Sequence, residues 1–280
     1  MKGETLMSCR KRKTENIGFR LRALFWASLV SMTLLLWMGP PHAAYAISLT
    51  NTAITGAEFA MFLGGSINSL NTTTLDVSPF FADDPMNNNF ADVDVLSQTF
   101  AGAGSASGFN VYLYQVLHKS GSDAASNLTQ LNIDWFTGIP TTIDLTGIGL
   151  GFVNSFYVTT APGGGLPGGF TMVGTKDPSG SEFLPGIPAT RFAFGTGPPD
   201  KSLAPSDRSF LLGLFSPQPP GLLPVNVVDG GLGSTFGTAY SPIPEPSTLW
   251  LLGIGFAGIV IYTSYRERRK GKGNSLRAHG

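Results

Sequence analysis

The chain has 280 residues, of which 42% are hydrophobic and 13% are charged, and its formal net charge at pH 7 is zero. This neutrality conceals a segregation of charge along the chain. Residues 1–46 carry seven basic and two acidic side chains, residues 47–242 carry five and fourteen, and residues 243–280 carry six and two. The acidic central region disfavours nucleic acid as a partner, because phosphate binding depends on Lys and Arg. Basic ends beside apolar runs are typical of membrane topology signals.

Residues 1–46 have the three parts of a signal peptide. A basic stretch precedes the apolar run ALFWASLVSMTLLLWM (23–38), and the small residues Ala44 and Ala46 fit the pattern of a signal-peptidase site. We therefore expect export, cleavage by signal peptidase and a mature chain that begins at Ile47. A retained signal anchor is the alternative.

Residues 47–242 are expected to form the exported domain. They contain 27 Gly and 16 Pro, a composition that approaches that of disordered chains. However, they also contain 17 Phe, four Tyr and one Trp, far more aromatic surface than a solvated coil carries. We therefore expect a single folded domain with a hydrophobic core.

An acidic segment, DVSPFFADDPMNNNFADVDV (76–95), contains candidate calcium ligands. Carboxylate and amide oxygens suit Ca²⁺, and an extracellular location would supply the ion. The candidates are Asp83, Asp84, Asp92 and Asp94. No D-x-D-x-D-G loop is present, and Asp92 and Asp94 also fit the solvent face of a strand. Apart from this calcium alternative, we expect no metal and no cofactor.

Alternation of apolar and polar residues predicts several short β-strands. The clearest is FNVYLYQVLH (109–118), in which Tyr112 and Tyr114 lie on the face opposite Val111 and Leu113. Other candidate strands cover residues 91–95, 131–136, 142–146, 155–160, 191–194, 209–215 and 225–228. Segments rich in Gly, Ser and Pro lie between them, and no long segment has a helical apolar repeat. The pattern predicts a mainly β fold, a single β-sandwich of jelly-roll or immunoglobulin-like type.

The exported domain offers little catalytic chemistry. The single cysteine, Cys9, lies in the leader, so no disulfide, thiol nucleophile or cysteine metal site is expected after export. The single histidine of residues 47–242, His118, is expected to be a solvated loop residue. The stretch GSASG (104–108) has Ala where a nucleophile elbow requires Ser, and no phosphate-binding loop is present. We therefore do not expect an enzyme.

Two further alternatives remain open. One is carbohydrate binding, in which sugar rings stack on the face formed by Tyr112 and Tyr114. The other is an extracellular hydrolase that acts through carboxylates, for which the domain offers two glutamates, Glu58 and Glu182, besides its aspartates.

The last element is an apolar run near the end of the chain. Residues 248–265 carry no charge, and as a helix they would span roughly 27 Å, slightly less than a hydrocarbon core of about 30 Å. Three glycines lie within the run, and a basic cluster follows it. The basic residues predict that this end stays in the cytoplasm, with residues 271–280 as a cytoplasmic tail.

Residues 243–270 resemble the sorting signal of PEP-CTERM proteins. The resemblance rests on the order of a Pro-Glu-Pro motif, an apolar run containing glycine and an arginine cluster, namely Pro244, Glu245, Pro246, Arg266, Arg268 and Arg269. The stretch VYLYQVLHKSGSDAASNLTQLNID also resembles a hairpin common in the ectodomains of this family, and this resemblance supports a β-sandwich. A plain C-terminal anchor is the alternative.

This resemblance implies an exported bacterial protein that an exosortase recognises at the Pro-Glu-Pro motif and processes. The apolar helix would hold the chain in the inner membrane transiently, before delivery to the cell surface or extracellular matrix. We therefore expect a non-catalytic structural or adhesive role in an exopolysaccharide-rich layer such as a biofilm. A carbohydrate- or calcium-binding module at the same place is the first alternative, and the hydrolase is the second.

Overall fold

The computed structural model describes residues 45–77, 91–120, 122, 127–135, 137–170, 172–195, 202–230, 233–243 and 262. The expected signal-peptide helix and the expected apolar C-terminal helix fall outside these ranges, apart from the single residue Tyr262. In the described ranges no helix has the length and hydropathy that a membrane crossing requires.

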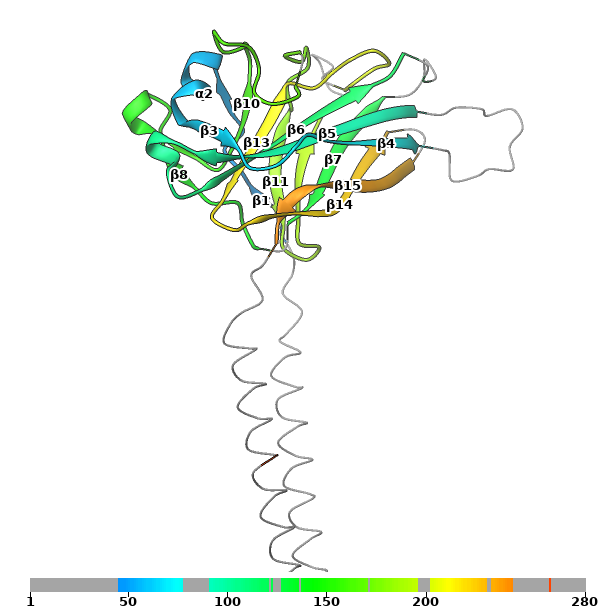
Figure 1. The fold of residues 1–280 in the computed structure, drawn as a ribbon. Coiled ribbons are helices and arrows are strands. Elements are labelled where there is room, and N and C mark those ends of the chain that lie inside the picture. Colours follow the sequence, from blue (N-terminus) through cyan, green and yellow to red (C-terminus); the bar gives the residue numbers. More distant parts are fainter. Residues whose placement is uncertain are drawn as a thin grey trace, which may run out of the picture. The chain divides into compact units, whose positions relative to one another are not determined.

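Strands dominate the described part of the chain, which confirms the expected mainly β fold (Figure 1). The elements, in chain order, are β1 (Ile47–Ser48), β2 (Thr52–Ile54), α2 (Gly56–Phe62), β3 (Leu63–Ser66), β4 (Asn71–Val77), β5 (Ala91–Gly102), η1 (Gly104–Ala106), β6 (Asn110–His118), β7 (Leu128–Asp134), β8 (Ile143–Asp144), η2 (Thr146–Ile148), β9 (Phe152–Val153), β10 (Ser155–Val158), β11 (Gly180–Leu184), β12 (Ala189–Ala193), β13 (Leu211–Ser216), β14 (Pro220–Asp229) and β15 (Gly233–Pro242).

These strands form three sheets. One has six strands in the order β1-β11-β12-β7-β14-β15. A second has seven strands, with the path β2-β10-β13-β6-β5-β3 and with β4 paired to β5. The third is the pair β8-β9. Nearly all neighbouring strands are antiparallel, and β10 with β2 is the parallel pair among the ladders of the described residues.

The main hydrophobic core takes side chains from both large sheets. Val93 and Val95 of β5 belong to it together with Leu131 and Ile133 of β7, and all four side chains are fully buried. At one end of this core, the rings of Tyr112 and Trp135 meet edge to face with their centroids 5.2 Å apart. Strand alternation explains the pattern, since every second residue of each strand faces the other sheet.

A second cluster covers the opposite face of the seven-stranded sheet. It contains Val111 and Leu113 of β6, Phe156 of β10, and Phe59 and Phe62 of α2. Because both faces of β6 are covered, its burial is almost continuous along its length. The second face of β6, with Tyr112 and Tyr114, is therefore buried although the sequence pattern did not predict it.

Helix α2 is short but well specified by its sequence. Thr55 is its N-cap, and the side chain of Thr55 accepts a hydrogen bond from the Glu58 backbone N–H. The Glu58 carboxylate in turn accepts from the Thr55 backbone N–H at 2.7 Å, which completes a capping box. The helix thereby holds its two buried phenylalanines against the sheet.

Side chains of the seven-stranded sheet bind the edge strand β15 of the other sheet. Asn71 and Thr73 of β4 donate to the carbonyl of Thr238 at 2.9 and 2.6 Å. The hydroxyl of Tyr114 donates to the carbonyl of Tyr240 at 2.6 Å. These bonds occupy backbone groups that a free sheet edge would expose to other chains.

The sequence-based strands compare well with the structure where alternation is clear. Segments 109–118, 142–146 and 155–160 contain β6, β8 and β10. Segments 131–136, 191–194, 209–215 and 225–228 cover parts of β7, β12, β13 and β14, and 91–95 is the start of a longer strand, β5. The long strands β4 and β15 were not predicted, because Thr, Ser and Gly predominate in them.

Candidate functional site: a carboxylate–lysine cluster

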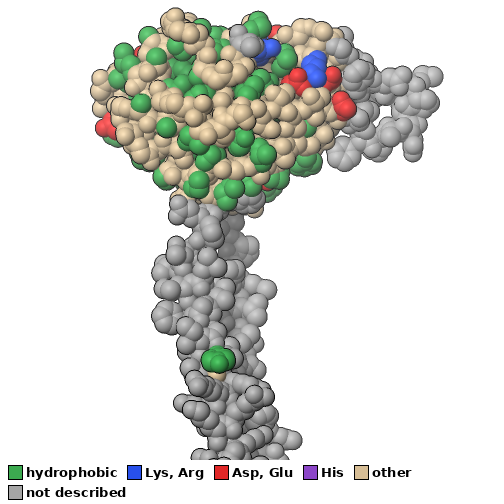
Figure 2. Space-filling model, in the orientation of Figure 1, with side chains coloured by type: hydrophobic (Ala, Val, Ile, Leu, Met, Phe, Trp, Pro, Cys, Tyr) green, Lys and Arg blue, Asp and Glu red, His purple; other side chains and the backbone are tan. Residues whose placement is uncertain are grey.

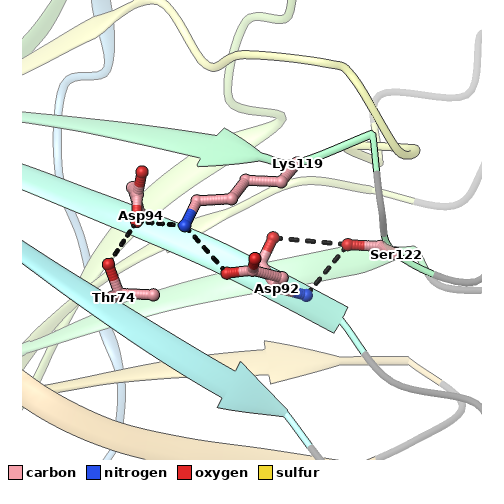
Figure 3. Close-up of polar contacts among 5 residues, drawn as sticks. All are labelled: Thr74, Asp92, Asp94, Lys119 and Ser122. Carbon is pink, nitrogen blue, oxygen red and sulfur yellow. Dashed lines mark hydrogen bonds and ion pairs between the residues drawn. The ribbon is translucent and has the colours of Figure 1, made fainter.

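A group of charged and polar side chains lies where β4, β5 and the end of β6 meet (Figure 3). Thr74 comes from β4, Asp92 and Asp94 come from β5, and Lys119 directly follows β6. The register pairs Thr74 with Asp94, while Asp92 and Asp94, two residues apart, share one face of their strand. We call Thr74, Asp92, Asp94, Lys119 and Ser122 the carboxylate–lysine cluster.

The Lys119 ammonium lies between the two carboxylates. Its Nζ is 3.0 Å from Asp92 Oδ1 and 2.9 Å from Asp94 Oδ1. The Thr74 hydroxyl donates a further hydrogen bond of 2.7 Å to Asp94 Oδ1. The Lys119 and Asp92 side chains are each 30% exposed, so these ion pairs lie at the protein surface and are only partly shielded from water.

Backbone groups tie the cluster to the chain that leaves β6. The Lys119 N–H donates to the Asp92 carbonyl at 2.8 Å. The Asp92 N–H donates to Ser122 Oγ at 2.9 Å. The first turn after β6 is therefore fixed to the beginning of β5 by both backbone and side-chain contacts.

The protonation state of Lys119 limits what the cluster can do chemically. Hydrogen bonds to Asp94 and Asp92 raise the pKa of Lys119. An ammonium held in this way is a poor nucleophile and a poor general base. The arrangement suits a structural ion-pair network better than a reaction centre.

The four calcium candidates fall into two pairs, of which the structure describes only one. Asp83 and Asp84 lie outside the described residues. Asp92 and Asp94 are brought together, but the ammonium of Lys119 lies within ion-pair distance of both carboxylates. Within the described ranges, no three His, Cys, Asp or Glu side chains are grouped as metal ligands.

The alternative in which sugar rings stack on Tyr112 and Tyr114 is wrong. Both side chains are fully buried in the main core, since the six-stranded sheet covers the face on which they lie. The Tyr112 hydroxyl donates to the Gln218 carbonyl at 2.7 Å, and burial raises the pKa of both phenols. Neither ring is accessible to a ligand in solution.

The expectation of a solvated loop histidine is also wrong. His118 is the last residue of β6 and is fully buried. Its Nδ1 lies 2.8 Å from the Leu203 carbonyl, and the adjacent segment contributes a bond from the Ser206 N–H to the His118 carbonyl. Desolvation lowers the pKa of His118. His118 lies an even number of residues from Tyr112 and Tyr114 and so shares their buried face, which was the available signal for its burial.

The two glutamates considered for a hydrolase both have structural partners. Glu58 completes the capping box of α2. Glu182 of β11 forms an ion pair of 2.8 Å with Arg191 of β12. Lys119 was the residue that sequence reasoning missed. The sequence did offer a sign of its role, because Lys119 is a basic residue that directly follows the clearly predicted strand 109–118 in an acidic region of the chain.

The residues of the predicted processing signals are mostly outside the described part of the chain. This applies to Pro244, Glu245, Pro246, Arg266, Arg268 and Arg269, and to Ala44 of the expected signal-peptidase site. Ala46 is described and exposed, and β1 begins at the next residue.

Comparison with known proteins identifies the end of the chain. The family model of the PEP-CTERM protein-sorting motif matches residues 242–269. No curated protein and no solved structure matches the chain. The motif begins at Pro242, the last residue of β15, and therefore follows the β domain directly. It implies exosortase-dependent sorting to the cell surface, with exosortase as the processing partner. The chain is thus a PEP-CTERM sorting domain-containing protein.

Proposed function

We propose that this protein is a non-catalytic structural or adhesive component of an exopolysaccharide-rich extracellular layer. The sorting motif at residues 242–269 carries the proposal, because it addresses the attached β domain to the cell surface. In this view the exported part is a single β-sandwich that needs no cofactor, and residues 248–265 hold the precursor in the inner membrane until exosortase acts.

The side-chain chemistry of the domain supports a structural role. The carboxylates of Asp92 and Asp94 are compensated by Lys119, and both glutamates of the domain are engaged in a helix cap or an ion pair. Aromatic side chains that would suit sugar stacking, such as Tyr112 and Tyr114, are used in the core. These polar and aromatic groups stabilise the fold.

The first test is the processing of the chain in a host that carries exosortase. Intact-mass spectrometry of the exported protein should find a chain that begins at Ile47 and lacks the segment after about Pro246. A host without exosortase serves as the control and should retain the longer precursor in its membranes. A chain that extends to Gly280 in both hosts would contradict processing and favour a plain anchor.

A second test concerns the role in the matrix. The purified domain should co-sediment with isolated exopolysaccharide or strengthen the layer that a deletion strain makes, and it should release no reducing ends from the polysaccharide. Steady release of reducing ends would overturn the non-catalytic proposal. A protein that stays free in the medium, with an unchanged layer after deletion, would contradict the structural or adhesive role.

A further inference from the structure

The end of the β domain from which the chain enters the sorting motif carries a group of exposed apolar side chains. The register places the start of β1, the β11–β12 turn, the start of β14 and the end of β15 at one end of the six-stranded sheet. Large exposed apolar residues that remain at this end after the expected cleavage before Ile47 are Ile47, Ile187, Leu222 and Ile243. We call these four residues the apolar end.

The exposure of these side chains is substantial. Ile187 is 71% exposed and Leu222 is 51% exposed. Single exposed apolar residues are ordinary, but several at one end of a domain point to an interaction surface. Figure 2 shows apolar side chains along the lower side of the domain, where these strand ends lie in Figure 1.

Half of the charged side chains of the described residues, seven of fourteen, lie toward the other end of the strands. The beginning of β5, the end of β6 and the end of β14 contribute them, together with the 202–209 segment, and they are Asp76, Asp92, Asp94, Lys119, Asp207, Arg208 and Asp229. Figure 2 shows blue and red side chains gathered at the upper right.

Among the described residues, the charged side chain nearest the apolar end by register is that of Asp134. Burial raises the pKa of Asp134, which favours the protonated, uncharged form of this side chain. Glu182 and Arg191 lie two residues further along their strands and neutralise each other.

The length of the connecting chain limits what can lie opposite the apolar end. Ile243 is the last residue of the described domain, and the uncharged run begins at Thr248. The five intervening peptide steps cannot extend beyond about 18 Å. If the run lies in a bilayer, the apolar end must therefore be close to that bilayer's surface.

We infer that the apolar end is a membrane-docking surface that contacts the lipid bilayer while the sorting segment is still attached. The inference rests on the proposed membrane-held precursor. Apolar side chains enter the boundary between headgroups and acyl chains by about 5–10 Å in interfacial proteins, which suits side chains that project from strand ends and turns. Docking would hold the segment after Ile243 close to the membrane, where a membrane-embedded processing enzyme acts.

Depth-dependent fluorescence quenching tests this surface in the full chain. A Cys9→Ser background allows single labels with an environment-sensitive dye at Leu222→Cys or Ile187→Cys. The matched controls are Phe236→Cys and Asp76→Cys. Phe236 is an apolar residue that is 72% exposed and lies in the half of the β14–β15 hairpin nearer its turn, away from the apolar end, and Asp76 lies at the charged end. Each labelled protein is reconstituted in phosphatidylethanolamine and phosphatidylglycerol vesicles with brominated acyl chains.

We expect brominated lipid to reduce the fluorescence of the labels at Leu222 and Ile187 and to leave the labels at Phe236 and Asp76 unchanged. Co-flotation with vesicles but equal quenching at all four positions would overturn the docking surface and leave the membrane-held precursor intact. Failure to co-float would overturn the precursor and the inference together. If the labels at positions 222 and 187 were protected from quenching by aqueous iodide but were not quenched by brominated lipid, the surface would be assigned to contact with a second copy of the chain. That result would overturn lipid docking.

Discussion

Replacement of Tyr114 by Phe should destabilise the domain without a change of shape. The Tyr114 side chain is fully buried, and its hydroxyl donates a 2.6 Å hydrogen bond to the carbonyl of Tyr240 in β15. The variant keeps the ring and its packing but leaves this carbonyl without the phenolic donor. Loss of a buried hydrogen-bond partner costs about 1–3 kcal/mol. In a domain of this size, each kcal/mol lowers Tm by roughly 2–4 °C, so a loss of about 2 kcal/mol gives a decrease of roughly 4–8 °C.

The assay is thermal unfolding followed by near-UV circular dichroism, in which the core pair Tyr112–Trp135 contributes to the signal. The assay uses a chain that retains residues 45 and 46, and Tyr45→Phe is its matched control, because Tyr45 is 79% exposed and its hydroxyl should contribute nothing measurable. Equal Tm values for the wild type, Tyr114→Phe and Tyr45→Phe would refute the bonded, buried position of Tyr114. If the folded wild type bound sugar and the folded Tyr114→Phe variant did not, this result would likewise contradict the burial of the Tyr114 ring.

Three other changes test separate parts of the fold. Burial lowers the pKa of His118 below about 6.5, so the unfolded chain takes up this proton first, and the urea midpoint should fall as the pH drops below that value. His118→Gln should weaken this pH dependence, and an unchanged slope would contradict it. Gly237→Val should cost about 1–3 kcal/mol in urea unfolding, because a Cβ at Gly237 would lie 2.3 Å from Thr73 Cγ2. Gly180→Ala, in open space, should be neutral, and equal costs for the two variants would argue against this close approach. Lys119→Met should cost about 0.5–2 kcal/mol for its two surface ion pairs, and this difference should shrink in 1 M salt. A cost that does not depend on salt would show that packing, rather than charge, holds the carboxylate–lysine cluster together.

Sequence alternation was a good guide where one face of a strand is apolar and the other is polar. In β7, Leu131 and Ile133 are buried while Asn132 and Asp134 are partly exposed, as the pattern predicts. The same reasoning failed in β6, because both faces of that strand are covered. The second face of the predicted strand left sugar stacking on Tyr112 and Tyr114 open as an alternative, whereas both rings are buried and the Tyr112 hydroxyl donates to a backbone carbonyl.

The candidate site depended on contacts between distant segments, and these are hard to foresee. The pairing of β4 with β5 places Thr74 beside Asp94, although twenty residues separate them. Neither strand order nor register follows from composition, so the partnership of Lys119 with both carboxylates could not be derived from spacing alone. The sorting signal was predictable because its parts are contiguous in the sequence, and the match to residues 242–269 confirms it.

The strand that leads into the sorting motif is also one through which side chains of the seven-stranded sheet bind the six-stranded sheet. β15 pairs with β14 along ten residues, and its carbonyls at Thr238 and Tyr240 accept hydrogen bonds from β4 and β6. Backbone bonds of an antiparallel ladder lie perpendicular to the strands, so a pull on Ile243 along β15 loads many of them together. A surface protein held through the chain beyond Ile243 would therefore transmit force to both sheets at once.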